Sequence, residues 1–111
     1  MIEGYHAHVY FATPAEAEVA RSLRAKLEAG FSVALGRWNA GPIGPHLCGS
    51  FEIAIPTMRV GELLSWLLLE RGELDILLHP LTGDDLVDHT DHALWLGAPR
   101  SLRLEAFGGA S

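Results

Sequence analysis

Residues 5–16 read YHAHVYFATPAE, and this stretch decides the fold because a strand signal is followed at once by a helix signal. From Tyr5 to Phe11, aromatic and β-branched residues alternate with period two, which is typical of a strand with one buried face. Thr13-Pro14-Ala15-Glu16 has the capping-box spacing, with proline at the first helical position. Apolar residues then recur at helical intervals until Gly30, at Val19, Ala20, Leu23 and Leu27.

The rest of the chain continues with strand and helix signals separated by turn residues. In chain order we expect a strand over 31–35, a Gly- and Pro-rich loop over 36–45, a strand over 51–55, a helix capped by Thr57, a strand over 74–78 and a short helix within 84–92.

The order β-α-β-β-α-β predicts an α+β fold of the ferredoxin-like, split βαβ type, with a four-stranded antiparallel sheet in the order 4-1-3-2. We expect both helices on one face, the first and third strands as parallel central neighbours, and the fourth antiparallel beside the first. Residues 1–97 form this domain, and 98–111 form a C-terminal tail in which Leu102 and Leu104 could add an edge strand. Because one sheet face would be bare, we expect a face-to-face homodimer.

The composition excludes several classes of protein. A hydrophobic fraction of 49% in 111 residues fits one packed domain rather than a disordered chain. The net charge of −6 offers no positive field to attract nucleic acid. No apolar run approaches the roughly 20 residues of a membrane span, and no signal segment precedes the first strand. The single cysteine, Cys48, excludes an internal disulfide and a multi-cysteine zinc site. We therefore expect a cytoplasmic protein that binds neither nucleic acid nor membranes.

Six histidines are the unusual feature of this small acidic chain. In the expected topology, the starts of the first and third strands and the end of the fourth share one edge of the sheet. His6 and His8 lie near the first of these strand ends, His46 near the second and His79 near the third. Period two places one polar set on the face away from the helices, namely His6, His8, Tyr10, Glu52, Asp75 and His79. The sequence thus predicts four histidines and Glu52 at one corner of the open face.

A single histidine on a strand is more often a surface or hydrogen-bonded residue than a ligand, but convergence from three segments predicts a metal or catalytic site. Neutral imidazole binds Fe, Zn, Cu and Ni. Two histidines with Glu52 would leave three positions open on Fe(II), whereas three histidines with water would resemble a hydrolytic zinc centre. We expect His8, His46 and His79 to bind the metal, with His6 or Glu52 completing the set or replacing one ligand.

The segment Asp84–His92 holds four aspartates and two histidines, which is also the composition of a solvated acidic helix start. Neighbouring aspartates would keep an imidazole protonated, so His89 and His92 suit proton transfer better than metal binding. His89 is the first candidate for the catalytic acid or base, and His6 is the second. The predicted substrate-binding residues are Glu52, His92 and Arg37, a loop residue that could clamp a substrate carboxylate.

Several blocks of this sequence resemble the DOPA 4,5-dioxygenase family: residues 5–11, Gly44-Pro45-His46, His79-Pro80 with 82–86, and 88–90 with 92–95 and Gly97. All six histidines lie in these blocks. The resemblance implies a ferredoxin-like, aromatic ring-opening dioxygenase that cleaves L-DOPA or a related catechol beside its two hydroxyls, an extradiol reaction. It implies O₂ as co-substrate and non-haem Fe(II) as cofactor, although zinc could occupy the site in a purified sample. Two alternatives stay open: a non-enzymatic metal-binding dimer that acts as a sensor or store, and a zinc-dependent hydrolase or isomerase.

Overall fold

The computed structural model describes residues 1–108, which form one antiparallel sheet of five strands with three α-helices. The strands are β1 (Tyr5–Phe11), β2 (Ala34–Leu35), β3 (Gly49–Ile55), β4 (Ile76–Pro80) and β5 (Leu94–Leu96). The helices are α1 (Pro14–Gly30), α2 (Val60–Glu70) and α3 (Asp85–Asp88). The strand order is β2-β3-β1-β4-β5. The α+β class and the order of the first four strands are as expected, but β5 pairs with β4 and makes the sheet five strands wide.

The capping signals differ between the two long helices. Thr13 Oγ1 accepts the backbone N–H of Glu16 at 3.1 Å, so α1 begins where its capping box predicts. The cap predicted at Thr57 is wrong, because a 3₁₀ turn over Thr57–Arg59 comes first and α2 begins at Val60 without a side-chain cap. The backbone of Pro56 is extended immediately before this turn.

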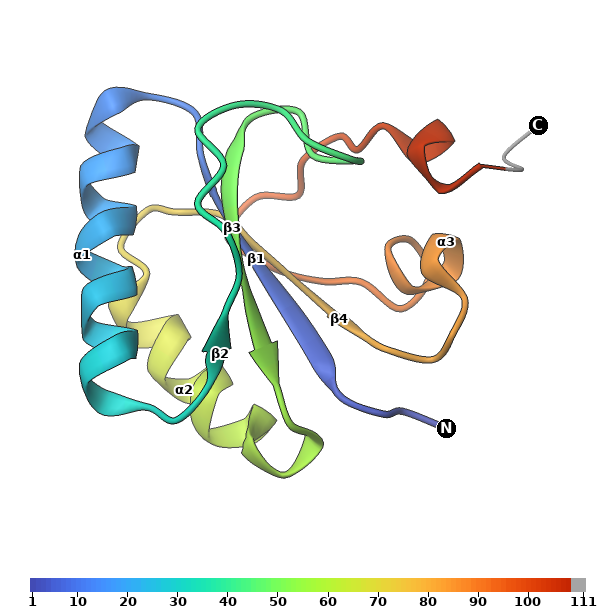
Figure 1. The fold of residues 1–111 in the computed structure, drawn as a ribbon, viewed down its shortest axis with the longest axis horizontal. Helices are drawn as coiled ribbons and strands as arrows, with labels where there is room; N and C mark the ends of the chain where they lie inside the picture. Colours follow the sequence, from blue (N-terminus) through green and yellow to red (C-terminus); the bar gives the residue numbers. More distant parts are fainter. Residues whose placement is uncertain (109–111) are drawn as a thin grey trace.

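One face of the sheet and the two long helices enclose the core. Figure 1 shows α1 and α2 together on one side of the sheet. The period-two pattern of residues 5–11 is confirmed, because Ala7 and Val9 are fully buried on this side. The helices and the other strands add further fully buried residues, among them Ala20, Leu27, Ile53, Leu63 and Ile76. This packing leaves the alternate strand positions on the opposite face, where the histidines lie.

The first and third strands are antiparallel, not parallel as expected. Tyr5 lies opposite Ile55, and Phe11 lies opposite Gly49. The physical reason is that the connection through α1 leaves β2 running in the same direction as β1, and the chain then reverses between the antiparallel neighbours β2 and β3. The start of β3 therefore lies at the far end of β1 from His6, and the shared-edge argument for His46 is wrong.

The second sheet face is not bare. Figure 1 shows α3 and the C-terminal segment on the side of the sheet away from α1 and α2. The edge strand expected near Leu102 and Leu104 is absent from residues 98–108, which include a 3₁₀ turn over Leu104–Phe107; residues 109–111 lie outside the described part. The face-to-face dimer stays a prediction, although its stated reason is weakened by this cover. Among the described helices, none combines the length and apolar character needed to cross a membrane.

Candidate metal and substrate site

Three histidines meet on the second sheet face because of the strand register. His6 on β1 lies directly opposite His79 on β4, and His8 lies two residues further along the same face of β1. One ring nitrogen from each of these three residues lies within 4.8 Å of the other two. His8 Nε2 and His79 Nε2 are 3.1 Å apart. The strands thus bring together three ring nitrogens that could bind the same metal ion.

The other ring nitrogens of two of these histidines have acceptor partners. His79 Nδ1–H donates to the carbonyl of Pro80 at 2.9 Å, which leaves Nε2 without a proton in the neutral ring. His6 Nδ1 lies 3.3 Å from Glu52 Oε1. Metal-binding histidines usually donate their second ring N–H to a carbonyl or a carboxylate. The donor set therefore fits a metal ion, and Glu52 contacts His6 as such a carboxylate.

Burial keeps His8 and His79 neutral, as metal binding requires. The exposed fraction is 6% for His8 and 2% for His79. Burial lowers the pKa of His8 well below its ordinary value, and the neighbouring histidines lower it further. Burial likewise lowers the pKa of His79 to about 4, although its hydrogen bond to Pro80 opposes the shift. Both rings are therefore neutral near pH 7. His8 Nε2–H donates to His79 Nε2, and a metal ion would take the place of this proton.

His46 joins the cluster from a loop rather than from a strand end. Its Nδ1 is hydrogen-bonded to the Tyr10 hydroxyl at 2.6 Å, and its ring centre lies 4.3 Å from that of His8. Burial lowers the pKa of His46 to about 4 and raises the pKa of Tyr10, so the pair is a neutral imidazole and a protonated phenol. His46 is outside the trio of closely spaced nitrogens. Tyr10 was given no role from the sequence, although its alternation with His6 and His8 placed it on their face.

His89 is the fifth histidine of the cluster. Its ring centre lies 3.9 Å from that of His79. His89 Nδ1–H donates to the carbonyl of Asp85 at 2.7 Å, so Nε2 is free to accept a proton. The buried Asp88 carboxylate positions α3 by accepting the backbone N–H and the hydroxyl of Thr82 at 2.8 and 2.7 Å.

The remaining predicted residues lie apart from the trio. His92 Nδ1 donates to Asp88 Oδ1 at 2.9 Å. Although burial would raise the pKa of Asp88, hydrogen bonds from His92 and Thr82 lower it overall. Arg37 is exposed, and its carbonyl accepts the side-chain N–H of Asn39. The structure therefore brings His6, His8, His46, His79, His89 and Glu52 together, and it leaves His92 and Arg37 outside this cluster.

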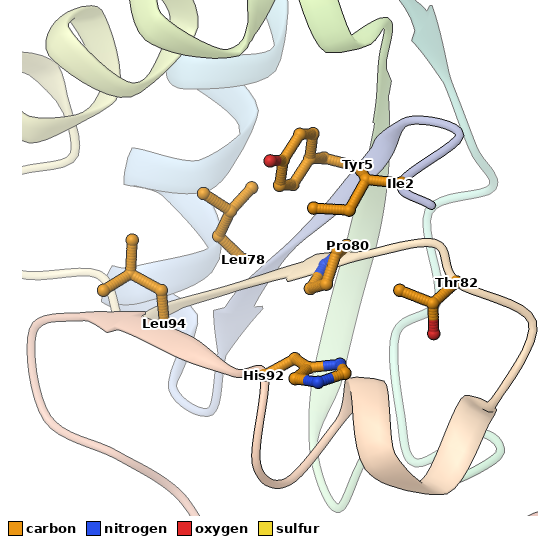
Figure 2. Close-up of a pocket in the computed structure, with 7 residues that line it drawn as sticks. All are labelled: Ile2, Tyr5, Leu78, Pro80, Thr82, His92 and Leu94. Carbon is orange, nitrogen blue, oxygen red and sulfur yellow. The ribbon is translucent and has the colours of Figure 1, made fainter.

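A cavity of about 240 Å³ opens beside the cluster and is lined by His8, Asn39, Ile43, Gly44, Pro45, His46, Ser50 and Glu52. A larger cavity of about 500 Å³ lies elsewhere, and Figure 2 shows the residues that line it, among them Tyr5, Leu78, Pro80, Thr82 and His92. Tyr5 and Leu78 alternate with His6 and His79, so this cavity lies on the other face of the sheet. Its mostly apolar lining offers no set of metal ligands. The smaller cavity is the one that suits chemistry at the histidines.

We expect the metal-free protein to lose stability as the pH falls from about 6.5 towards about 4. The folded-state pKa values of His46 and His79 lie below those of the unfolded chain, so the unfolded chain binds more protons in this window. Each ring contributes on the order of 3 kcal/mol to the fall in the free energy of unfolding across this window. Urea unfolding at a series of pH values measures the effect, and a flat profile across this window would contradict it.

A family model and a curated relative of this chain name the same family. Residues 5–106 match the model of the Dopa 4,5-dioxygenase family. The DOPA 4,5-dioxygenase of Amanita muscaria is 38% identical over an alignment of 111 positions, and the match covers 93% of this chain and 49% of that protein. An uncharacterized 21.2 kDa protein of Botryotinia fuckeliana is 34% identical over an alignment of 98 positions, and the match covers 80% of this chain and 54% of the relative. This chain spans about half the length of these curated relatives.

A solved structure is similar over nearly the whole chain. It is the crystal structure of a Nostoc punctiforme protein provisionally described as a dioxygenase. The TM-score is 0.93 at 45% sequence identity, with 99% of this chain and 95% of that chain covered.

Proposed function

This chain belongs to the Dopa 4,5-dioxygenase family, and on that premise we propose that it is an extradiol dioxygenase. The proposed reaction opens the ring of L-DOPA or a related catechol with O₂ and non-haem Fe(II). The observation that carries the proposal is the 3.1 Å approach of His8 Nε2 and His79 Nε2, two buried neutral rings, of which His8 lines a cavity of about 240 Å³. Imidazole nitrogens are good ligands for Fe(II), and three of them leave coordination positions open.

His6, His8 and His79 would hold the iron, because their ring nitrogens lie closest together. His46, which the sequence analysis placed in the ligand set, lies against His8 and is the candidate for a further ligand or a substrate contact. When bound, Fe(II) supplies the electron transfer that allows O₂ to react with a catechol. The strands already hold the three rings near one another, so little conformational entropy is lost when the site forms.

The cavity beside His8 offers the catechol both apolar and polar contacts. Ile43 and Pro45 present apolar surface to an aromatic ring, whereas Ser50 and Glu52 present groups that hydrogen-bond to hydroxyls. Tyr10 fixes the orientation of the His46 ring at the same cavity. These residues would bind the flat substrate and orient its two hydroxyls towards the cluster.

His89 is the proposed base and acid. Its Nδ1 is engaged by Asp85, so Nε2 is the atom that would take a proton from a catechol hydroxyl. Extradiol cleavage adds both atoms of O₂ to the catechol, so the semialdehyde product in its acid form has the same number of hydrogens as the substrate. The proton taken at Nε2 is therefore returned, and one residue serves both steps.

The decisive experiment loads the protein with Fe(II) without air and then admits O₂ with a panel of catechols that includes L-DOPA. We expect catechol-dependent O₂ uptake with one O₂ consumed per catechol and a yellow product. Metal analysis of protein purified without added metal accompanies the assay. Tight zinc, no O₂ uptake and no colour with any catechol would reject the dioxygenase and favour the metal-binding or zinc-hydrolase alternatives.

A further inference from the structure

The C-terminal segment, residues 100–107, contacts the loop that carries His46 and the ring of His89, the two histidines of the cluster that lie outside the strands. His6, His8 and His79 are placed by strand register, but His46 lies on a loop and His89 follows the short helix α3. Since these two rings cannot be placed by backbone pairing within the sheet, other contacts must hold them. One distant segment contacts the two loop residues that precede His46 and the ring of His89.

On the His46 side, Arg103 makes two hydrogen bonds to the loop. Its backbone N–H donates to the carbonyl of Pro45 at 2.8 Å, and its guanidinium donates to the carbonyl of Gly44 at 2.9 Å. Gly44, Pro45 and His46 all line the cavity beside His8. Arg103 therefore fixes a wall of that cavity from outside.

On the His89 side, Phe107 packs on the imidazole. The two ring centres are 4.5 Å apart with their planes inclined by 42°. A second ring neighbour of His89 is His79, whose ring centre lies at 3.9 Å. His89 therefore contacts both a strand histidine and the C-terminal aromatic ring.

The start of the segment is anchored to the sheet. Arg100 Nε donates to Asp75 Oδ2 at 3.0 Å, and the backbone N–H of Ala98 donates to Asp75 Oδ1 at 2.8 Å. Asp75 directly precedes β4, the strand that carries His79. The segment thus begins at a fixed point on the sheet and reaches the loop and α3 from there.

We infer that Arg103 and Phe107 are positioning residues of the catalytic site, the first for the His46 wall of the substrate cavity and the second for the His89 proton acceptor. The catalytic part of this inference rests on the proposed dioxygenase function. Residues 100–107, which the sequence predicts to belong to a C-terminal tail, are then part of the site. The family match, which extends to residue 106, covers nearly all of it.

The test compares full-length Arg103→Met and Phe107→Ala with the wild type in the iron-loaded state. We expect Arg103→Met to raise KM for the catechol about fivefold with little change in kcat, because the loosened wall weakens substrate binding. We expect Phe107→Ala to lower kcat about tenfold at similar KM, because His89 loses its packing partner. Phe107→Tyr keeps the aromatic ring and should restore most of the activity. Iron content should stay at the wild-type level in all three variants.

The matched control is Arg59→Met, which removes an arginine from the 3₁₀ turn before α2, where it pairs with Glu62. Its kinetic constants should equal those of the wild type. The inference is overturned when Arg103→Met and Phe107→Ala behave like this control, or when either variant loses its iron.

A second readout separates this inference from the proposed function. Proton–nitrogen correlation spectra of the histidine rings can be recorded on protein that has no activity at all. We expect the signals of His46 to shift in Arg103→Met and those of His89 to shift in Phe107→Ala, while those of His6 stay in place. A wild type without O₂ uptake would reject the dioxygenase, whereas ring signals unchanged in both variants would reject the positioning role.

Discussion

Replacing His79 by Gln should abolish iron retention and ring cleavage together. The variant removes the ring nitrogen that lies 3.1 Å from His8 Nε2, and an amide is a poor substitute for imidazole at a metal. We expect the affinity for iron to fall by more than about a hundredfold. Even the loss of a residue that only orients a ligand lowers metal affinity about ten- to a hundredfold. Iron content after anaerobic loading and gel filtration, together with O₂ uptake, measures the effect.

His92→Gln is the matched control for metal content. The His92 ring bonds Asp88 and lies outside the group of closely spaced nitrogens, so this variant should retain the wild-type amount of iron. His8→Gln should reproduce the loss seen with His79→Gln, because both rings contribute to the same nitrogen pair. If His79→Gln holds iron as tightly as the wild type, the proposed ligand set is wrong.

Replacing His89 by Gln should lower kcat by about a hundredfold or more while the iron content stays unchanged, since general acid–base catalysis typically contributes about 10²- to 10⁴-fold. The glutamine side chain can keep a hydrogen bond to the Asp85 carbonyl, but it cannot accept and return a proton near neutral pH. Steady-state O₂ uptake, with iron measured on the same samples, separates the two effects.

Two outcomes would contradict the role of His89. Activity within about twofold of the wild type would show that another group moves the proton. Loss of iron along with activity would make His89 a metal ligand instead.

Much of the sheet could be predicted from local pattern. The alternation over residues 5–11 correctly separates the buried Ala7 and Val9 from the histidines on the other face. The capping box at Thr13 correctly gives the start of α1. Both are encoded within a few neighbouring residues, because side-chain direction alternates along a strand and cap bonds span one helical turn.

The direction of β3 and the placement of His46 could not be obtained in the same way. The prediction that His46 meets the other histidines agrees with the structure, but the stated reason, a shared edge of parallel strands, is wrong. His46 reaches His8 because its loop is held there by Tyr10 and Arg103. These partners are separated from the loop by long stretches of chain, so no local spacing reports them.

By itself, the sequence determined the α+β class, the two faces of the central strands and the family, because periodicity, caps and short motifs are properties of neighbouring residues. Only the tertiary structure decided which nitrogens lie closest together, namely those of His6, His8 and His79, and which segment holds the other two rings. Strand register and the path of a C-terminal segment depend on contacts between residues far apart in the chain. The histidines are thus visible in the sequence, whereas their division into a strand-held trio and a pair supported by residues 100–107 exists only in the fold.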